Sequence, residues 1–130
     1  MTEELRIAIY AALLGMFQLC LAAWSPLGVP GYLRWNTGPR DTPFDVGPVP
    51  GRLRRVFQNF METYVFFAVI VVALALAHKS DAVSIWGARA YLIARIVYIP
   101  CYAFAISYVR SAVWAVSFFG IVATACCLLF

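Results

Sequence analysis

Residues Gly51 to Phe67 read GRLRRVFQNFMETYVFF and open a long apolar segment of the chain. The segment nevertheless carries Arg55, Asn59 and Glu62 at a depth where a membrane helix is normally apolar. Their spacing of four and three residues places all three side chains on one face if the stretch is helical. Charged side chains inside a membrane usually face a protein interior or a watery cavity, because exposure to lipid is costly. We therefore predict that this row lines a polar pocket.

The composition of the chain is that of a membrane protein. Its 130 residues are 64% apolar with a mean hydropathy of +0.84, whereas soluble globular proteins are about 45–50% apolar. Four apolar segments each approach the ~20 residues needed to cross a bilayer core. The predicted fold is a single all-α integral membrane domain over residues 1–130, a bundle of four transmembrane helices at about 5–24, 53–77, 82–104 and 109–130. The cysteines lack metal-type spacing and are interpreted as small buried hydrophobes, with no metal site expected (Cys20, Cys101, Cys126 and Cys127).

The distribution of basic residues predicts the orientation of these helices. Arginines concentrate in the loop 25–51, in the helix end that follows it and at the start of the last helix (Arg34, Arg40, Arg52, Arg54, Arg55 and Arg110). The positive-inside rule then places the first and third connections in the cytoplasm and both termini outside. The acidic start of the chain does not resemble a secretory signal, so residues 5–24 are expected to be a retained span.

The loop 25–51 holds six of the seven prolines and five of the eight glycines, so it cannot be a span. Loops of this length are commonly lids or disordered segments. Two interpretations stay open. The part from Arg34 to Asp41 either folds over the cytoplasmic mouth of the bundle, or lies on the membrane surface with its arginines against anionic lipid headgroups.

A second polar row occupies the predicted helix 82–104. Tyr91, Arg95, Tyr98 and Tyr102 are spaced four, three and four residues apart and form one stripe. Pro100 lies in the same helix and is expected to bend it. The predicted orientation places this stripe at the cytoplasmic end, at the same depth as the row from Arg55 to Glu62.

Three segments thus bring polar residues to one level, because Arg110 opens the last helix on the same side. Glu62 and Arg95 are the predicted ion pair at the floor of the pocket. A purely structural interpretation explains one such pair, but it leaves the remaining arginines unpaired at the membrane end. A bound anionic ligand would pair with these arginines, because an arginine guanidinium binds a carboxylate in a bidentate manner. We therefore favour a ligand site.

With these residues the chain resembles the MAPEG family, the membrane-associated proteins of eicosanoid and glutathione metabolism. The resemblance covers essentially the whole chain, and its motifs are Arg55-x-x-x-Asn59-x-x-Glu62, Arg95-x-x-Tyr98-x-x-x-Tyr102 and Arg110-Ser111. It implies a left-handed four-helix bundle assembled as a homotrimer. It also implies that glutathione binds between neighbouring subunits near the cytoplasmic face, while a lipophilic substrate enters from the bilayer.

The resemblance assigns roles to individual residues. Glutathione, the co-substrate, is expected to be held by six side chains (Arg55, Asn59, Glu62, Arg95, Tyr98 and Tyr102). Arg110 is the candidate catalytic residue, because a nearby arginine lowers the pKa of a thiol from its ordinary ~8.5 and stabilises the thiolate. The arginine that the eicosanoid enzymes place at the end of the first helix has no counterpart within 5–24. The segment from Gly38 to Asp41 resembles a bacterial branch of the family, which implies a bacterial inner membrane.

The leading prediction is a membrane glutathione-dependent transferase or peroxidase that acts on a lipophilic electrophile. The alternative is a catalytically silent membrane scaffold that binds lipid or glutathione. A third class, a four-helix drug transporter, needs a proton-exchanging acid in the membrane. Glu62 is the only deep acid and lies beside arginines that hold it ionised, so this class is the least favoured. The expected partners are a lipophilic small molecule, the bilayer and two further copies of the chain, with no nucleic acid.

Overall fold

A computed structural model describes all residues from Met1 to Phe130, and its regular secondary structure is entirely helical. The elements are α1 (Glu3–Trp24), the 3-10 turn η1 (Ser25–Gly28), α2 (Tyr32–Thr37), α3 (Pro48–Leu76), α4 (Ala82–Ala103) and α5 (Ser107–Leu129). The four long helices α1, α3, α4 and α5 are each long and apolar enough to cross a membrane. The predicted all-α fold with four spans is confirmed, and the chain is a multi-pass integral membrane protein.

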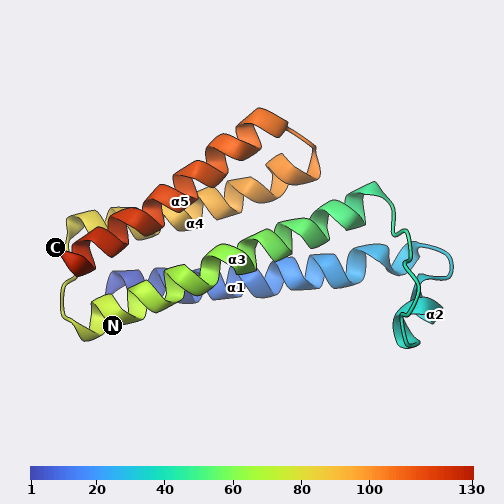
Figure 1. The fold of residues 1–130 in the computed structure, drawn as a ribbon, viewed down its shortest axis with the longest axis horizontal. Coiled ribbons are helices and arrows are strands. Elements are labelled where there is room, and N and C mark those ends of the chain that lie inside the picture. The colour runs from blue at the N-terminus through green and yellow to red at the C-terminus, as the bar shows by residue number, and fades with distance from the viewer.

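The long helices pack as two pairs, α1 with α3 and α4 with α5 (Figure 1). Further contacts of α4 and α5 with α3, and of α4 with α1, join the pairs into one bundle. Both chain termini and the α3–α4 turn lie at one end, which we call the terminal end. The segment from η1 to α2 and the α4–α5 turn lie at the opposite end, which we call the loop end (Figure 1).

The core of the bundle lies where α1, α3 and α4 meet. Phe67 of α3 stacks on Tyr91 of α4 with ring centroids 4.1 Å apart, and both are 0% exposed. The hydroxyl groups of Thr63 and Tyr91 form a hydrogen bond of 3.1 Å beside this stack. Because small residues such as Ala8 and Ala11 on α1 are also buried here, the helices approach closely.

Two helices differ in detail from the sequence pattern. α3 begins at Pro48, earlier than the expected residue 53, because a proline is well suited to the first turn of a helix and the preceding Gly47 adopts a positive φ of 88°. α4 stays helical through Pro100, which lies near its end, where the missing backbone donor affects little of the helix. Of the four free cysteines Cys101 alone is buried and Cys126 is exposed, so the expectation of buried cysteines holds only for Cys101.

The terminal end is held by side chains that the sequence analysis did not single out. The carboxylate of Glu4 is 0% exposed and accepts hydrogen bonds from the hydroxyls of Ser80, at 2.7 Å, and Ser84. Glu3 forms a salt bridge with Arg89 of α4. The first turn of α1 is thereby tied to the start of α4.

The loop between α1 and α3 is folded. Tyr32, Trp35 and Phe44 form an aromatic cluster with ring centroids 5.5 to 5.9 Å apart. The turn η1 contacts α1 and α3, whereas neither η1 nor α2 contacts α4 or α5. Within one chain the loop therefore closes the end of the α1–α3 pair and is not a lid over the α3, α4 and α5 junction.

Candidate functional site

The polar row of α3 lies along its side facing α5. Asn59 and Glu62 line a groove between α3 and α5 with a volume of about 450 Å³. Glu62 is exposed, whereas Asn59 is half-buried and its Oδ1 atom is buried without a hydrogen-bond partner. Arg55, one turn closer to the loop end, is exposed. A buried acceptor without a donor is uncommon, so Asn59 marks a place where a donor is missing from the chain.

The polar stripe of α4 lies deeper in the bundle. Arg95 is 1% exposed, and Tyr91 and Tyr98 are also buried. The Arg95 guanidinium carbon lies 4.5 Å from the ring centroid of Tyr98 and 5.7 Å from that of Phe60 on α3. None of its three side-chain nitrogens has a hydrogen-bond partner. Arg95 is therefore a buried cation that contacts aromatic faces only.

Tyr102 is the residue at which three helices meet. Its hydroxyl accepts a hydrogen bond of 3.0 Å from Nε of Arg55 on α3. Its ring centroid lies 4.7 Å from the guanidinium carbon of Arg110 on α5 and 5.7 Å from the ring of Tyr98. We call Arg55, Tyr98, Tyr102 and Arg110 the Tyr102 cluster. It holds two arginines and no carboxylate.

The cluster is supported by a contact between α3 and α4. Nη1 of Arg52 donates a hydrogen bond of 3.2 Å to the carbonyl oxygen of Ala103. This carbonyl belongs to the last turn of α4, where helix carbonyls have no partner within the helix. Arg52 thereby fixes the start of α3 against the end of α4, close to Tyr102.

The predicted ion pair between Glu62 and Arg95 is not formed in this chain. The single salt bridge of the structure joins Arg89 to Glu3 at the terminal end. The reason is the rotation of α3, whose Phe60 faces Arg95. Two residues further along an α-helix the direction changes by about 200°, so Glu62 points away from Arg95 and into the α3–α5 groove.

The α3–α5 groove combines a polar and an apolar part. Asn59, Glu62 and Thr63 lie toward the loop end, and the lining continues along Phe66 and Ile70 of α3. On α5 it is formed by an apolar row that begins at Trp114 (Trp114, Phe118, Ile121, Val122 and Ala125). Arg55 and Arg110 each lie one turn before the first lining residue of their helix, so the Tyr102 cluster borders the polar end.

Thr63, Trp114 and Phe118 also line the groove, although they were not among the predicted site residues. Trp114 and Phe118 stack with ring centroids 5.5 Å apart. Their spacing of four residues was the available signal, because side chains at this spacing lie on one face of a helix. An apolar stripe of α5 is thereby aligned with the polar row of α3.

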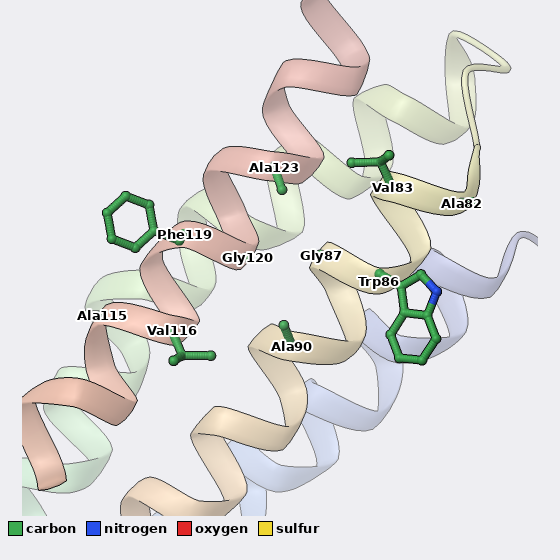
Figure 2. Close-up of a pocket in the computed structure, with 10 residues that line it drawn as sticks. All are labelled: Ala82, Val83, Trp86, Gly87, Ala90, Ala115, Val116, Phe119, Gly120 and Ala123. Carbon is green, nitrogen blue, oxygen red and sulfur yellow. The ribbon is translucent and has the colours of Figure 1, made fainter.

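A second groove, of about 600 Å³, runs between α4 and α5 near the terminal end (Figure 2). Gly87 and Gly120 face each other there, and the helices cross so closely that a Cβ atom on Gly120 would lie 2.6 Å from the Gly87 carbonyl oxygen. No ionisable side chain lines this groove. The close approach of Gly87 and Gly120 fixes α4 against α5, and the groove beside it offers no reactive group. The α3–α5 groove with the Tyr102 cluster is therefore the candidate site.

Comparison with known proteins gives one finding. No curated protein and no solved structure matches the chain. The sequence profile of the MAPEG family matches residues 7–130, which include all four long helices apart from the first turn of α1. The match also contains both polar rows and Arg110. Since it extends over nearly the whole chain, this protein belongs to the MAPEG family.

Proposed function

We propose that the protein is a glutathione-dependent membrane transferase or peroxidase that acts on a lipophilic electrophile and works as a homotrimer. Family membership suggests roles in glutathione-related or lipid metabolism. The Tyr102 cluster carries the proposal further, because Arg55 and Arg110 from two helices converge on one tyrosine without any carboxylate. Unpaired arginines at the end of an apolar groove suit a ligand with a carboxylate-bearing part and a lipophilic part.

The residues of the chain fit the tripeptide in charge and in hydrogen-bonding capacity. Arg55 has further guanidinium donors available for a carboxylate. The unpartnered Oδ1 of Asn59 suits an amide N–H or an ammonium group. Glu62, exposed in the groove and without a basic partner, suits the ammonium group. The proposed binding set is therefore Arg55, Asn59, Glu62, Arg95, Tyr98 and Tyr102.

Arg95 has a different position from the other members of this set. It lies behind the Tyr98 and Phe60 rings, and Tyr98 is the member of the Tyr102 cluster that it contacts. A buried cation acts over longer distances than an exposed one, because the surrounding dielectric constant is low. We assign Arg95 the roles of orienting Tyr98 and attracting the anionic ligand, with direct contact only if an aromatic ring moves aside.

Arg110 is the proposed catalytic residue. Bound glutathione supplies the sulfur nucleophile, and a thiol with a pKa of ~8.5 is mostly protonated at neutral pH. An arginine beside the sulfur favours the thiolate, and each pKa unit of lowering corresponds to ~1.4 kcal/mol. Arg110 is half-buried and has no carboxylate partner, so its charge is available for this purpose.

The test is glutathione-dependent consumption of an aryl halide or a lipid hydroperoxide by the purified protein. Arg110→Ala should lower kcat about 8- to 25-fold at pH 7, the loss of thiolate expected when a pKa lowered by one or two units returns to ~8.5. The deficit should shrink as the pH rises, since the thiol then ionises without help. Arg34→Ala is the matched control, because Arg34 is an exposed arginine of α2 at the same end of the bundle.

The possible results separate the hypotheses. An Arg110→Ala variant with wild-type kcat at neutral pH would remove the thiolate role. Glutathione binding without turnover of any electrophile would select the silent scaffold instead. Crosslinking of the purified protein tests the trimer independently, and a persistent monomer with full activity would contradict the proposed assembly.

A further inference from the structure

A third cavity lies at the loop end on another side of α3. Its volume is about 350 Å³, and it is bounded by the last turns of α1, the folded loop and the first turns of α3. None of its lining residues belongs to the Tyr102 cluster or to the α3–α5 groove. The cavity is thus independent of the proposed glutathione site.

Helical spacing explains how the cavity forms. Arg54, Phe57 and Gln58 are spaced three and one residues apart and share a face of α3 that differs from the face of Arg55 and Asn59. Leu19 and Ala22 are three residues apart and lie on one face of α1. These two faces form the floor and one wall.

The loop forms the opposite wall and is held in place. Trp35 lines the cavity, stacks on Phe44 at 5.5 Å and donates a hydrogen bond of 2.6 Å from Nε1 to the Thr42 carbonyl oxygen. Tyr32, which also lines the cavity, is only 9% exposed. A helix as short as α2 is not stable alone, so these aromatic contacts are what orders the wall.

Two cations line the cavity without a partner. Arg40 comes from the loop and Arg54 from α3, and neither forms a salt bridge or a side-chain hydrogen bond. No carboxylate lines this cavity, and neither Asp41 nor Asp45 forms a salt bridge with the two arginines. Arg40 also has a left-handed backbone with φ of 58°, a strained conformation for a residue with a side chain.

The position of the cavity indicates its ligand. It begins where α1 ends at Trp24, at the level of the headgroups if α1 spans the bilayer. Its apolar part is formed by Leu19, Ala22 and Phe57, and Leu19 is at the same time exposed on the surface of α1. A soluble phosphate compound needs the two arginines but has no use for this apolar floor.

We propose that the cavity binds an anionic phospholipid, with the phosphate of the headgroup between Arg40 and Arg54 and an acyl chain along Leu19 and Phe57. Arginine suits a phosphate because its fork of N–H donors matches two phosphate oxygens. Because a zwitterionic headgroup also carries an ammonium group that the two arginines repel, the site favours anionic over zwitterionic lipids.

The experiment measures the quenching of Trp35 fluorescence by lipids with brominated acyl chains. The chain has four tryptophans, so the host protein carries Trp24→Phe, Trp86→Phe and Trp114→Phe. It is reconstituted into phosphatidylcholine vesicles that contain a minor fraction of brominated phosphatidylglycerol or of brominated phosphatidylcholine. We expect stronger quenching by the anionic lipid. Arg40→Gln or Arg54→Gln should lower the relative affinity about fivefold each, the effect of one arginine near a membrane surface.

Arg34→Gln is the matched control, because Arg34 is an exposed arginine of the same loop that does not line this cavity. Equal loss of selectivity in the Arg34, Arg40 and Arg54 variants would overturn the proposal in favour of general surface charge. Relief of quenching by millimolar glycerol phosphate would overturn it in favour of a soluble ligand. Arg40→Gly removes the charge at a position of positive φ that glycine adopts without strain. Loss of selectivity in this variant with an unchanged unfolding temperature excludes misfolding as the cause.

Discussion

Replacement of Arg95 by methionine should make the free protein more stable and should weaken glutathione binding. Arg95 is 1% exposed, and all three of its side-chain nitrogens are buried without a hydrogen-bond partner. A cation in this position loses its hydration and gains only two aromatic contacts, at 4.5 Å to Tyr98 and 5.7 Å to Phe60. Methionine is flexible enough to fill the same space without a polar group.

The expected gain follows from opposing contributions. Burial of an ion costs several kcal/mol even after the protein relaxes. A desolvated cation–aromatic contact returns about 2 kcal/mol or more, but only the Tyr98 contact is close, since the Phe60 contact is near the distance limit of ~6 Å. Replacement of buried charges by apolar residues of similar volume is often neutral or stabilises by about 1–4 kcal/mol. We expect Arg95→Met to fall within this range.

Arg89→Met is the matched control on the same helix. The Arg89 side chain is 40% exposed, forms the salt bridge with Glu3 and lies 5.0 Å from the Trp86 ring centroid. An exposed pair of this kind contributes about 0.2–1 kcal/mol, so its loss should lower stability slightly. The same chemical change is thus expected to have opposite signs at two positions of α4.

The assay is thermal unfolding of the detergent-solubilised protein with and without glutathione. Wild type should gain stability with glutathione according to RT ln(1 + [L]/Kd), about 2.7 kcal/mol at 100 times Kd. Arg95→Met should unfold at a higher temperature without glutathione and gain less than wild type from its addition. An unfolding temperature below that of Arg89→Met without glutathione would refute the view that Arg95 is an uncompensated cation.

Three further predictions concern stability at other positions. Gly120→Ala should lower the free energy of unfolding by about 1–3 kcal/mol, because the added Cβ would lie 2.6 Å from the Gly87 carbonyl oxygen and 3.1 Å from the Tyr91 backbone nitrogen. The measurement is the unfolding temperature. The control Gly28→Ala, whose added Cβ has no atom within 4 Å, should change it little. Glu4→Ala should lower thermal stability by about 1.5–3 kcal/mol, because the buried hydroxyl of Ser84 and the exposed hydroxyl of Ser80 lose a charged acceptor. Glu3→Ala, which removes a half-exposed ion pair, should lower it less. The hydrogen bond from the Ser84 backbone N–H, and after it one with Cys127, holds the pKa of Asp81 below its ordinary value of 3.8. The contribution of Asp81 to folding stability should therefore be complete above that pH and disappear as the pH falls through the lower folded value. Unfolding temperatures measured down to about pH 3 should fall more steeply for wild type than for Asp81→Asn.

The four membrane-spanning helices and the common depth of the polar rows could be predicted from the sequence. Hydropathy and length identify membrane helices well, because a bilayer leaves few alternatives for the backbone. Alternation of direction along the chain then places the starts of α3 and α5 and the end of α4 at one end, where Arg55, Tyr102 and Arg110 lie in contact.

The rotation of each helix about its axis was beyond the same reasoning. The period of α3 shows that Asn59 and Glu62 share a face, but not which neighbour this face meets. That choice is made by packing, since Phe60 and Thr63 are buried against α4 and turn Glu62 toward α5. The ion pair of Glu62 with Arg95 was therefore predicted from depth alone and is wrong for this chain.

The aromatic contacts of the loop and the hydrogen bonds at the helix ends could not be predicted from the sequence either. The sequence between residues 25 and 51 shows prolines and glycines, yet the mutual packing of Tyr32, Trp35 and Phe44 decides where the loop lies. Glu4 was interpreted only as part of an acidic start. Its burial depends on Ser80 and Ser84, which are distant in sequence and come near only after the helices pair.

The surroundings of the first turns of α3 explain why these turns carry polar residues although they belong to a membrane helix. One face packs on α4 through Phe60, a second lines the α3–α5 groove through Asn59, and a third lines the α1–α3 cavity through Arg54 and Gln58. The polar side chains of these turns line hollows of the protein, where they are tolerated at lower cost than against lipid. Beyond Phe67 no polar side chain lines either hollow, and the sequence becomes uniformly apolar. The two proposed ligands would thus bind on different sides of one helix, and a ligand that rotated α3 would alter both sites together.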